Sequence, residues 1–351
     1  MRVCRFFHEE AEFIGFYDDS RVFPLDQVVE AYLENIDDSF EMPPVNDILD
    51  LLPPYGEFAE EARVVHTWLM SLDAEDQAGL SIAIDDIDLL TPMEAPPKIL
   101  LLAGNYAEHI KESGGIAVER AETFPYVFMK PTTTLNCDGG PVIIPMVSPD
   151  HIDWECELGV IIGEVCKGVT EEEALGYVAG YTVVNDISDR KFKPNPDRKT
   201  RDRDKHFDWL HGKWHDTFLP VGPCILSAEG VDPSKFHLTL KVNGETKQNC
   251  GTDKMIFPVE AVISFISQWV TLEPGDLIAT GTPSGVGNAS GTYLKHGDQL
   301  EAEISGIGVL KNPVISESEW LAQVAQADGL EEDEEDFDDE DYFDEEDEDR
   351  Q

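Results

Sequence analysis

The sequence predicts an α+β protein that is predominantly β, with a small N-terminal α/β domain, a larger strand-rich domain and a disordered acidic C-terminal tail. Three observations support this fold class. Short apolar runs between glycine, proline and polar turn residues recur along the chain and are typical of strands. Fewer segments show the apolar periodicity of amphipathic helices. The final segment, 329–351, is strongly acidic and too poor in apolar residues to bury a core.

The N-terminal domain is predicted at 1–95. RVCRFF, FIGFYDD and SRVFPL have the composition of strands, and DQVVEAYLENI has the pattern of a short amphipathic helix. A second helix is expected over 57–72. TPMEAPPKI, at 91–99, carries three prolines, which predicts a linker or the entry to the next domain.

The larger domain is predicted at 96–315, followed by a C-terminal helix at 316–328. It opens with the buried-strand pattern KILLLAG, and NYAEHIKES then begins a helix with Asn105 as its expected N-cap. Thr170 with Glu173 predicts a capping box, and Asn243-Gly244 predicts a hairpin turn. The remaining expected elements are the strands YVFMKPTTTL, GPVIIP, YTVVNDIS, FLPVGPCIL and DLIAT, the helix FPVEAVISFISQWV, and the closing strands of DQLEAEISGIGVLKNPV. The stretch 191–216 is polar and aperiodic, which predicts a long loop.

The formal net charge of −47 is spread over the whole chain. Residues 331–350 hold 16 acids and one arginine, so this segment carries −15 and the remainder still carries −32. Nucleic acids and anionic membranes are excluded as partners, because binding to either requires clustered Lys and Arg. Solubility or a saline cytoplasm explains the acidity.

The six cysteines are scattered without a CxxC pair. This spacing is neither a disulfide framework nor a structural zinc site, and it favours a reducing cytosol. Acids stand where a signal peptide needs an apolar stretch, and no apolar run is long enough to span a membrane. We therefore expect a soluble cytoplasmic protein.

Three acids alternate in DWECEL. Asp153, Glu155 and Glu157 occupy every second position of a predicted strand, so their side chains would share one face about 6–7 Å apart. A solvated strand face is the simplest explanation, but the intervening residues are apolar and the strand continues into the apolar run 158–162. Burying unpaired carboxylates costs several kcal/mol. A divalent cation would offset that cost, and oxygen-only ligands suit Mg²⁺, Mn²⁺ or Ca²⁺ rather than zinc.

A third ligand is expected from another strand, because two carboxylates rarely suffice to hold such an ion. Asp186 is the best candidate. It ends YTVVND, a strand too apolar to lie on the surface.

His109 and Glu112 are three residues apart on the helix predicted at NYAEHIKES, and therefore lie on the same face. A carboxylate beside an imidazole orients the ring and raises its basicity, as a water-activating general base requires. An ordinary surface His–Glu pair is the alternative.

Two further residues are candidates for ligand contacts. ATGTPSGVG, at 279–287, is neither a Walker A motif nor a dinucleotide-binding motif. It is either a simple tight turn or a close backbone approach to a ligand, with Thr282 offering a hydroxyl. Lys213 directly precedes a strand in HGKWHDTFLPVGP, whereas lone lysines are usually solvated on polar helices.

Six motifs together resemble the fumarylacetoacetate hydrolase family over roughly 98–315. In chain order they are GNY followed by His109 and Glu112, FMKP at 128–131, DWECEL at 153–158, VVND at 183–186, GKWHDTFLPVGP at 212–223 and TGTPSGVG at 280–287. The resemblance implies a mixed β-roll catalytic domain, a small N-terminal domain and a homodimer.

The resemblance also implies roles for individual residues. The family's ExE…D motif, which binds Mg²⁺ or a similar ion, maps onto Glu155, Glu157 and Asp186, and it leaves Asp153 outside the set of ligands. Its lid-helix dyad maps onto His109 and Glu112. Its substrate-contacting lysine and threonine map onto Lys213 and Thr282.

The activity implied by this resemblance is Mg²⁺-dependent hydrolysis of a C–C bond in an acylpyruvate or a fumarylacetoacetate-like 2-oxo acid. The small acid would chelate the ion, Lys213 would stabilise the enolate, and His109 with Glu112 would activate water. Without a placed water, the same site would support isomerisation or decarboxylation of 2-hydroxymuconate-type diacids, or dehydration of sugar acids. A scaffold that only binds partners or cations is the non-enzymatic alternative, and it has no need for clustered buried carboxylates.

Three departures from the family pattern concern the metal ligands and the substrate end. LLLAG replaces an upstream acidic ligand found in the animal hydrolases, so three carboxylates are expected. Lys193 stands where many members have glutamine, and the charged insertion 194–211 is longer than usual. These changes leave the substrate's identity open, and the acidic tail matches no family role.

Overall fold

Most strands of the protein join one large mixed sheet in the computed structural model, which describes residues 1–327. Its order is β4-β3-β2-β1-β14-β12-β11-β17-β6-β7, with β5 also pairing with β1 and β8 with β14. The strands are β1 (Arg2–His8), β2 (Ala11–Asp18), β3 (Arg21–Pro24), β4 (Ile82–Ala83), β5 (Asp88–Leu89), β6 (Ile99–Ala103), β7 (Tyr126–Met129), β8 (Leu135–Asn136), β11 (Cys156–Ile162), β12 (Val178–Asn185), β14 (Leu219–Ser227) and β17 (Leu277–Ala279). The tail predicted at 329–351 lies outside the described residues.

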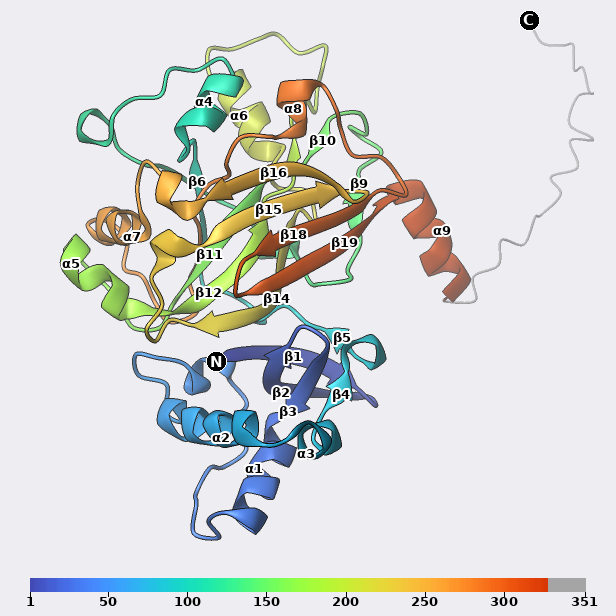
Figure 1. Ribbon diagram of the computed structural model, residues 1–351. Coiled ribbons are helices and arrows are strands. Elements are labelled where there is room, and N and C mark those ends of the chain that lie inside the picture. Colours follow the sequence, from blue (N-terminus) through green and yellow to red (C-terminus); the bar gives the residue numbers. More distant parts are fainter. Residues whose placement is uncertain (328–351) are drawn as a thin grey trace, which may run out of the picture.

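A second sheet packs against one face of the large sheet (Figure 1). Its five strands run in the order β16 (Glu245–Gly251), β15 (His237–Val242), β18 (Gln299–Ile304), β19 (Gly308–Ser316) and β9 (Val142–Ile144). A separate two-stranded ribbon joins β10 (Ile152–Asp153) to β13 (Ser188–Asp189). This arrangement confirms the strand-rich α+β fold class.

The helices lie around these sheets and are mostly short. They are α1 (Leu25–Asn35), α2 (Ala59–Ser71), α3 (Ala74–Gly79), α4 (Ala107–Glu112), α5 (Glu171–Ala174), α6 (Asp204–His211), α7 (Val259–Ser267), α8 (Gly287–Ser290) and α9 (Glu317–Ala327). Among the described residues, no helix is both long and apolar enough to cross a membrane.

The central strands β11 and β12 supply two hydrophobic cores. Val160 and Val183 point into the core shared with the second sheet. Ile161 and Val184 point into the core shared with α1 and α2. A strand covered on both faces is apolar at successive positions, which explains the continuous run at 158–162.

The N-terminal segment extends the large sheet. β1 pairs antiparallel with β14, matching Arg2 with Leu226 and Val3 with Ile225. α1 and α2 cover this end of the sheet (Figure 1). The segment therefore shares a continuous backbone hydrogen-bond network with the strands that carry the candidate site.

Two local predictions hold. Thr170 and Glu173 form both bonds of a capping box at the start of α5. Asn243 and Gly244 have positive φ angles of 53° and 78° and connect β15 to β16, as an Asn-Gly hairpin turn requires.

Two other local predictions are wrong. Tyr106, not Asn105, is the N-cap of α4. The Asn105 side chain is buried, donates to the carbonyls of Phe257 and Thr280, and accepts from the Phe257 N–H, so it fixes loops instead of capping. The stretch 191–216 contains α6 where a loop was expected, because its helix is short and carries both charged and aromatic side chains.

His66 on α2 generates a stability prediction. Its ring lies edge-on to Phe16, with centroids 5.0 Å apart, and burial lowers its pKa to about 4, helped by the N-terminal amine and Arg2. The unfolded chain binds this proton below about pH 6.5, whereas the folded chain resists it until about pH 4. Stability from neutral His66 is therefore complete above pH 6.5 and decreases as the pH falls towards 4.

His66→Leu should flatten the pH dependence of the free energy of unfolding between pH 6.5 and 4, measured by urea denaturation. An unchanged slope in His66→Leu would contradict the prediction.

Candidate active site

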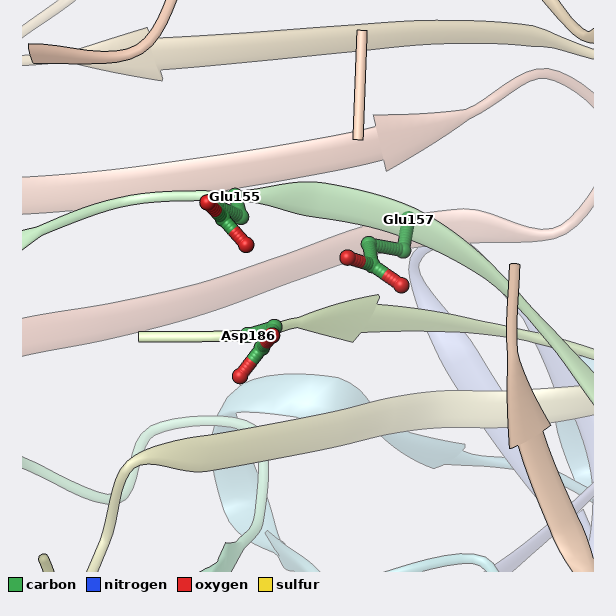
Figure 2. Close-up of side chains that lie close together, drawn as sticks. All are labelled: Glu155, Glu157 and Asp186. Atoms are coloured by element: carbon green, nitrogen blue, oxygen red, sulfur yellow. The ribbon is translucent and has the colours of Figure 1, made fainter. Parts of the chain in front are cut away.

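Three carboxylates meet where two central strands end. Glu155 and Glu157 flank the first residue of β11, and Asp186 directly follows β12. These strands are antiparallel, with Cys156 opposite Asn185, so the start of one lies beside the end of the other. One oxygen of each carboxylate lies within 4.8 Å of the others, and all three residues are buried (Figure 2).

The donor set of this cluster fits a divalent cation. Glu157 accepts a 2.7 Å hydrogen bond from the Gly281 N–H through Oε2, while its buried Oε1 has no hydrogen-bond partner. Burial raises the pKa of Glu157, and the neighbouring charges of Asp186 and Glu155 raise it further. A cation would complete the coordination of Oε1 and stabilise the ionised form, and its three carboxylate ligands suit Mg²⁺, Mn²⁺ or Ca²⁺.

Lys213 and Lys130 place positive charge against Asp186. Lys213 Nζ lies 2.7 Å from Glu155 and 2.5 Å from Asp186. Burial disfavours its charged form, but Asp186 and Glu155 outweigh that effect, so the pKa of Lys213 is raised. Lys130 Nζ lies 2.7 Å from the other oxygen of Asp186 and also donates to the Phe218 and Ile187 carbonyls.

The sequence interpretation assigned no role to Lys130. Its signal was present in FMKP, where a lysine directly follows the apolar strand β7. Complete burial lowers its pKa to about 8, against the opposing effect of Asp186.

Arg190 joins Asp153 to the cluster. Its Nε donates to Asp153 at 2.7 Å, and its Nη2 lies 2.6 Å from Glu155. Burial would raise the pKa of Glu155, but Arg190 and Lys213 outweigh burial and hold it well below its usual range. Sequence reasoning missed Arg190, although it lies in the DRKFK segment in which Lys193 was singled out. Lys193 itself is exposed.

Asp153 is not on the same strand as the two glutamates. The predicted strand is interrupted at Trp154 and Glu155, so Asp153 belongs to the β10–β13 ribbon. Its carboxylate accepts from the N–H groups of Trp154, Gly287 and Asn288. Asp153 thus holds Arg190 and the first residues of α8, and it stands outside the cluster of three potential ligands.

His109 and Glu112 form the expected pair on α4. His109 Nδ1 lies 2.9 Å from Glu112 Oε1, and the Gly285 N–H donates to both oxygens of Glu112. Gly285 has φ = 104°, and a Cβ there would come within 2.1 Å of the Lys247 carbonyl oxygen. Only glycine fits this position, and it links the glycine-rich turn to the dyad.

Thr282 lies at the site, but its hydroxyl has protein partners. It donates to the Cys156 carbonyl at 2.9 Å and accepts from Gln248 Nε2 at 2.8 Å. Gln248, which sequence reasoning missed, also accepts from the Cys156 N–H. These bonds fix the turn against β11, and contact between Thr282 and a substrate oxygen stays a prediction.

A small cavity of about 60 Å³ connects these groups. Its polar lining contains His109, Glu155, Arg190, Lys213 and Thr282. Glu157 and Asp186 do not line the cavity themselves but lie beside Glu155 in the carboxylate cluster. Glu112 likewise contacts the cavity-lining His109. A larger groove of about 410 Å³ between α1 and β2 lies away from this chemistry, and the charged residues that line it are all acids. The predicted residues therefore come together at the smaller cavity.

The fold and this cavity define an enzyme whose carboxylate cluster suits a divalent cation. Residues 98–315 match the model of the fumarylacetoacetate (FAA) hydrolase C-terminal domain, and the chain belongs to that family.

Similar proteins have different activities. A 2,4-didehydro-3-deoxy-L-rhamnonate hydrolase of Sphingomonas sp. is 39% identical over 256 residues, covering 72% of this chain and 84% of its own length. A mitochondrial oxaloacetate tautomerase of Xenopus laevis is 37% identical, covering 66% and 69% respectively. The structure of maleylpyruvate hydrolase from Sphingobium sp. SYK-6, in complex with manganese (II) ion and pyruvate, aligns with a TM-score of 0.64 at 26% identity, covering 90% of this chain and 99% of that chain. The family thus includes both hydrolases and isomerases.

Lys130→Met should lower the free energy of unfolding by about 3–5 kcal/mol, because it leaves one oxygen of the buried Asp186 carboxylate and two buried carbonyls without their donor. Urea denaturation in the presence of EDTA would measure this. The control is Lys111→Met, which removes an exposed pair with Glu108 and should cost at most about 1 kcal/mol. Equal effects of the two changes would show that Lys130 is not needed to balance the cluster.

Proposed function

We propose that this enzyme is a Mg²⁺-dependent hydrolase that cleaves a C–C bond in an acylpyruvate-like 2-oxo acid. The observation that carries the proposal is the convergence of His109, held by Glu112, with the carboxylate cluster and Lys213 at one cavity. An imidazole with a bound carboxylate is the group that water activation needs. A hydrolase of a 2,4-dioxo sugar acid and a maleylpyruvate hydrolase among the similar proteins support the same reaction class.

Glu155, Glu157 and Asp186 would hold the ion, which would act as a Lewis acid toward the substrate's carboxylate and 2-oxo oxygens. The bond from His109 Nδ1 to Glu112 leaves Nε2 to accept a proton from water. The resulting hydroxide adds to the acyl carbonyl, the C–C bond breaks, and its electron pair leaves on the enolate of pyruvate. Lys213 places positive charge where that enolate develops. The proton that His109 took from water then passes to the enolate carbon, which completes the reaction.

Isomerisation is the second candidate function, supported by the similarity to an oxaloacetate tautomerase. The carboxylate cluster and Lys213 favour an enolate whether or not water is activated. The same half of the site would therefore serve a tautomerase, a decarboxylase or isomerase of 2-hydroxymuconate-type diacids, or a sugar-acid dehydratase. The dyad favours hydrolysis, because none of these alternatives consumes water as a nucleophile.

We further propose that the enzyme works in the cytoplasm as a homodimer on a small-molecule substrate. The six cysteine thiols are unpaired and four of them are buried, which suits a reducing compartment. Light scattering of the purified protein would test the dimer.

Glu157→Gln should weaken Mg²⁺ binding at least about 100-fold, since it neutralises the carboxylate whose Oε1 lacks a partner. Calorimetric titration would measure the binding, and acylpyruvate turnover should fall in parallel and be abolished by EDTA. Glu108→Gln, on the exposed side of α4, is the control and should leave both unchanged. Normal Mg²⁺ affinity in Glu157→Gln would refute the assignment of the cluster.

His109→Ala should reduce acylpyruvate hydrolysis by about 10²–10⁴-fold, because a general base contributes that factor. Mg²⁺-dependent decarboxylation of oxaloacetate should persist in the same variant, since it needs enolate stabilisation without water activation. Measuring both reactions makes decarboxylation the internal control. Hydrolysis that survives this change would show that His109 is not the base.

A further inference from the structure

The part of the cavity that would face the substrate's acyl group differs from the part that carries charge. Leu102, Ala103, Gly104, Phe128 and Trp209 complete its lining. None of these five residues carries a charge, and together they form what we call the wall of the cavity. We infer that Trp209 determines specificity, so that the enzyme prefers 2-oxo acids with a small, uncharged acyl group to those that carry a second carboxylate. This inference rests on the proposed function and names its substrate class.

The insertion 194–211 holds Trp209 in place. Arg198 bridges Asp204 and Asp208 of α6, with 3.1 Å between its Nε and Asp204. Arg201 lies 2.9 Å from the other oxygen of Asp204. These ion pairs connect the loop to the helix that carries Trp209. The charged residues of the insertion thus fix an aromatic side chain in the cavity wall and do not themselves line the cavity.

Trp209 packs against the residue beside the catalytic lysine. Its ring meets Phe128 edge-on, with centroids 5.0 Å apart, and Lys213 Nζ lies 5.5 Å from the Phe128 centroid. Trp209 therefore borders the position where the enolate is proposed to develop.

Trp209 also separates the cavity from an outer groove. Ala103, Phe128 and Trp209 line both the cavity and a groove of about 300 Å³, whose other residues include Phe124, Tyr126, Phe265 and Trp269. The partition limits the length of the acyl group, and the space beyond it is lined by His206 and otherwise by apolar and aromatic side chains.

The pairing of the cations at the site supports a substrate with an uncharged acyl group. Lys130, Lys213 and Arg190 are each paired with a buried carboxylate of Asp153, Glu155 or Asp186. A second carboxylate would meet the uncharged wall, and both cations that line the cavity are already paired with acids. An unpaired buried charge costs several kcal/mol.

The first experiment compares substrates and ligands on the wild-type enzyme with Mg²⁺. kcat/KM for 2,4-dioxopentanoate should exceed that for the matched diacid, 2,4-dioxohexanedioate, at least about tenfold, the effect of a single poorly solvated group. Calorimetry on His109→Ala should show tighter binding of the unreactive monoacid 2-oxobutanoate than of the unreactive diacid 2-oxoglutarate. Equal or reversed preference in binding would overturn the inference.

The second experiment changes the wall. Trp209→Arg should shift the binding ratio at least about tenfold toward 2-oxoglutarate, because it supplies the missing cation. Trp269→Arg adds the same charge in the outer groove, outside the cavity, and should not change the ratio. Trp209→Ala should join the two spaces and raise the relative kcat/KM for 2,4-dioxodecanoate at least about tenfold over 2,4-dioxopentanoate.

A second variant keeps the test decisive if the first one misfolds. If Trp209→Arg does not fold, Trp209→Ala and the wild-type ligand order still decide the inference. An unchanged ratio in folded Trp209→Arg, or no gain for the long acyl group in Trp209→Ala, would refute it. If the wild-type enzyme hydrolyses none of the substrates but still binds 2-oxobutanoate more tightly than 2-oxoglutarate, the proposed function is refuted and the inference about Trp209 stands.

Discussion

Burying four carboxylates around the ends of β11 and β12 is the constraint on which the site depends. Asp153, Glu155, Glu157 and Asp186 are all buried, and like charges at this spacing oppose folding unless they are compensated. The surrounding sequence supplies that compensation from distant segments, with Lys130 after β7, Arg190 after β13 and Lys213 before β14. Forming the site therefore requires the large sheet to be assembled.

The negative charge of one carboxylate, that of Glu157, is not compensated by a cation, and its Oε1 atom has no hydrogen-bond partner. Every carboxylate except Glu157 has a cationic partner, and Glu157 has only the Gly281 N–H. The same turn that provides this donor bonds Glu112 through Gly285. The glycine-rich turn thus supports the carboxylate cluster and the His–Glu dyad together. Two parts of the proposed mechanism share one backbone segment, whose geometry depends on positive φ angles at Gly281 and Gly285.

The sequence was informative where a physical pattern was local. The alternation of acids, the apolar strands and the i, i+3 spacing of His109 and Glu112 are all visible in short windows, and the structure brings these residues together. The strand-rich fold class followed from the same windows.

Long-range partners could not be predicted in this way. Nothing local distinguishes Arg190 from the other charges of its loop, and the use of Asn105 depends on carbonyls more than 150 residues away. The break between β10 and β11 also depends on a distant partner, because β10 pairs with β13. A strand pattern alone does not show where the chain changes sheets.

The two halves of the cavity follow different physical requirements. In the charged half, each buried carboxylate needs a partner, so replacing one residue leaves a neighbouring charge unpaired and lowers the stability of the fold. The wall formed with α6 has no such requirement, because Trp209 meets Phe128 through apolar contact alone. Replacing an apolar wall residue changes shape and polarity without leaving a buried charge unpaired. In the proposed function, chemistry that depends on the enolate is thereby fixed by the sheet, while the inferred choice of acyl group rests on one helix of a charged insertion.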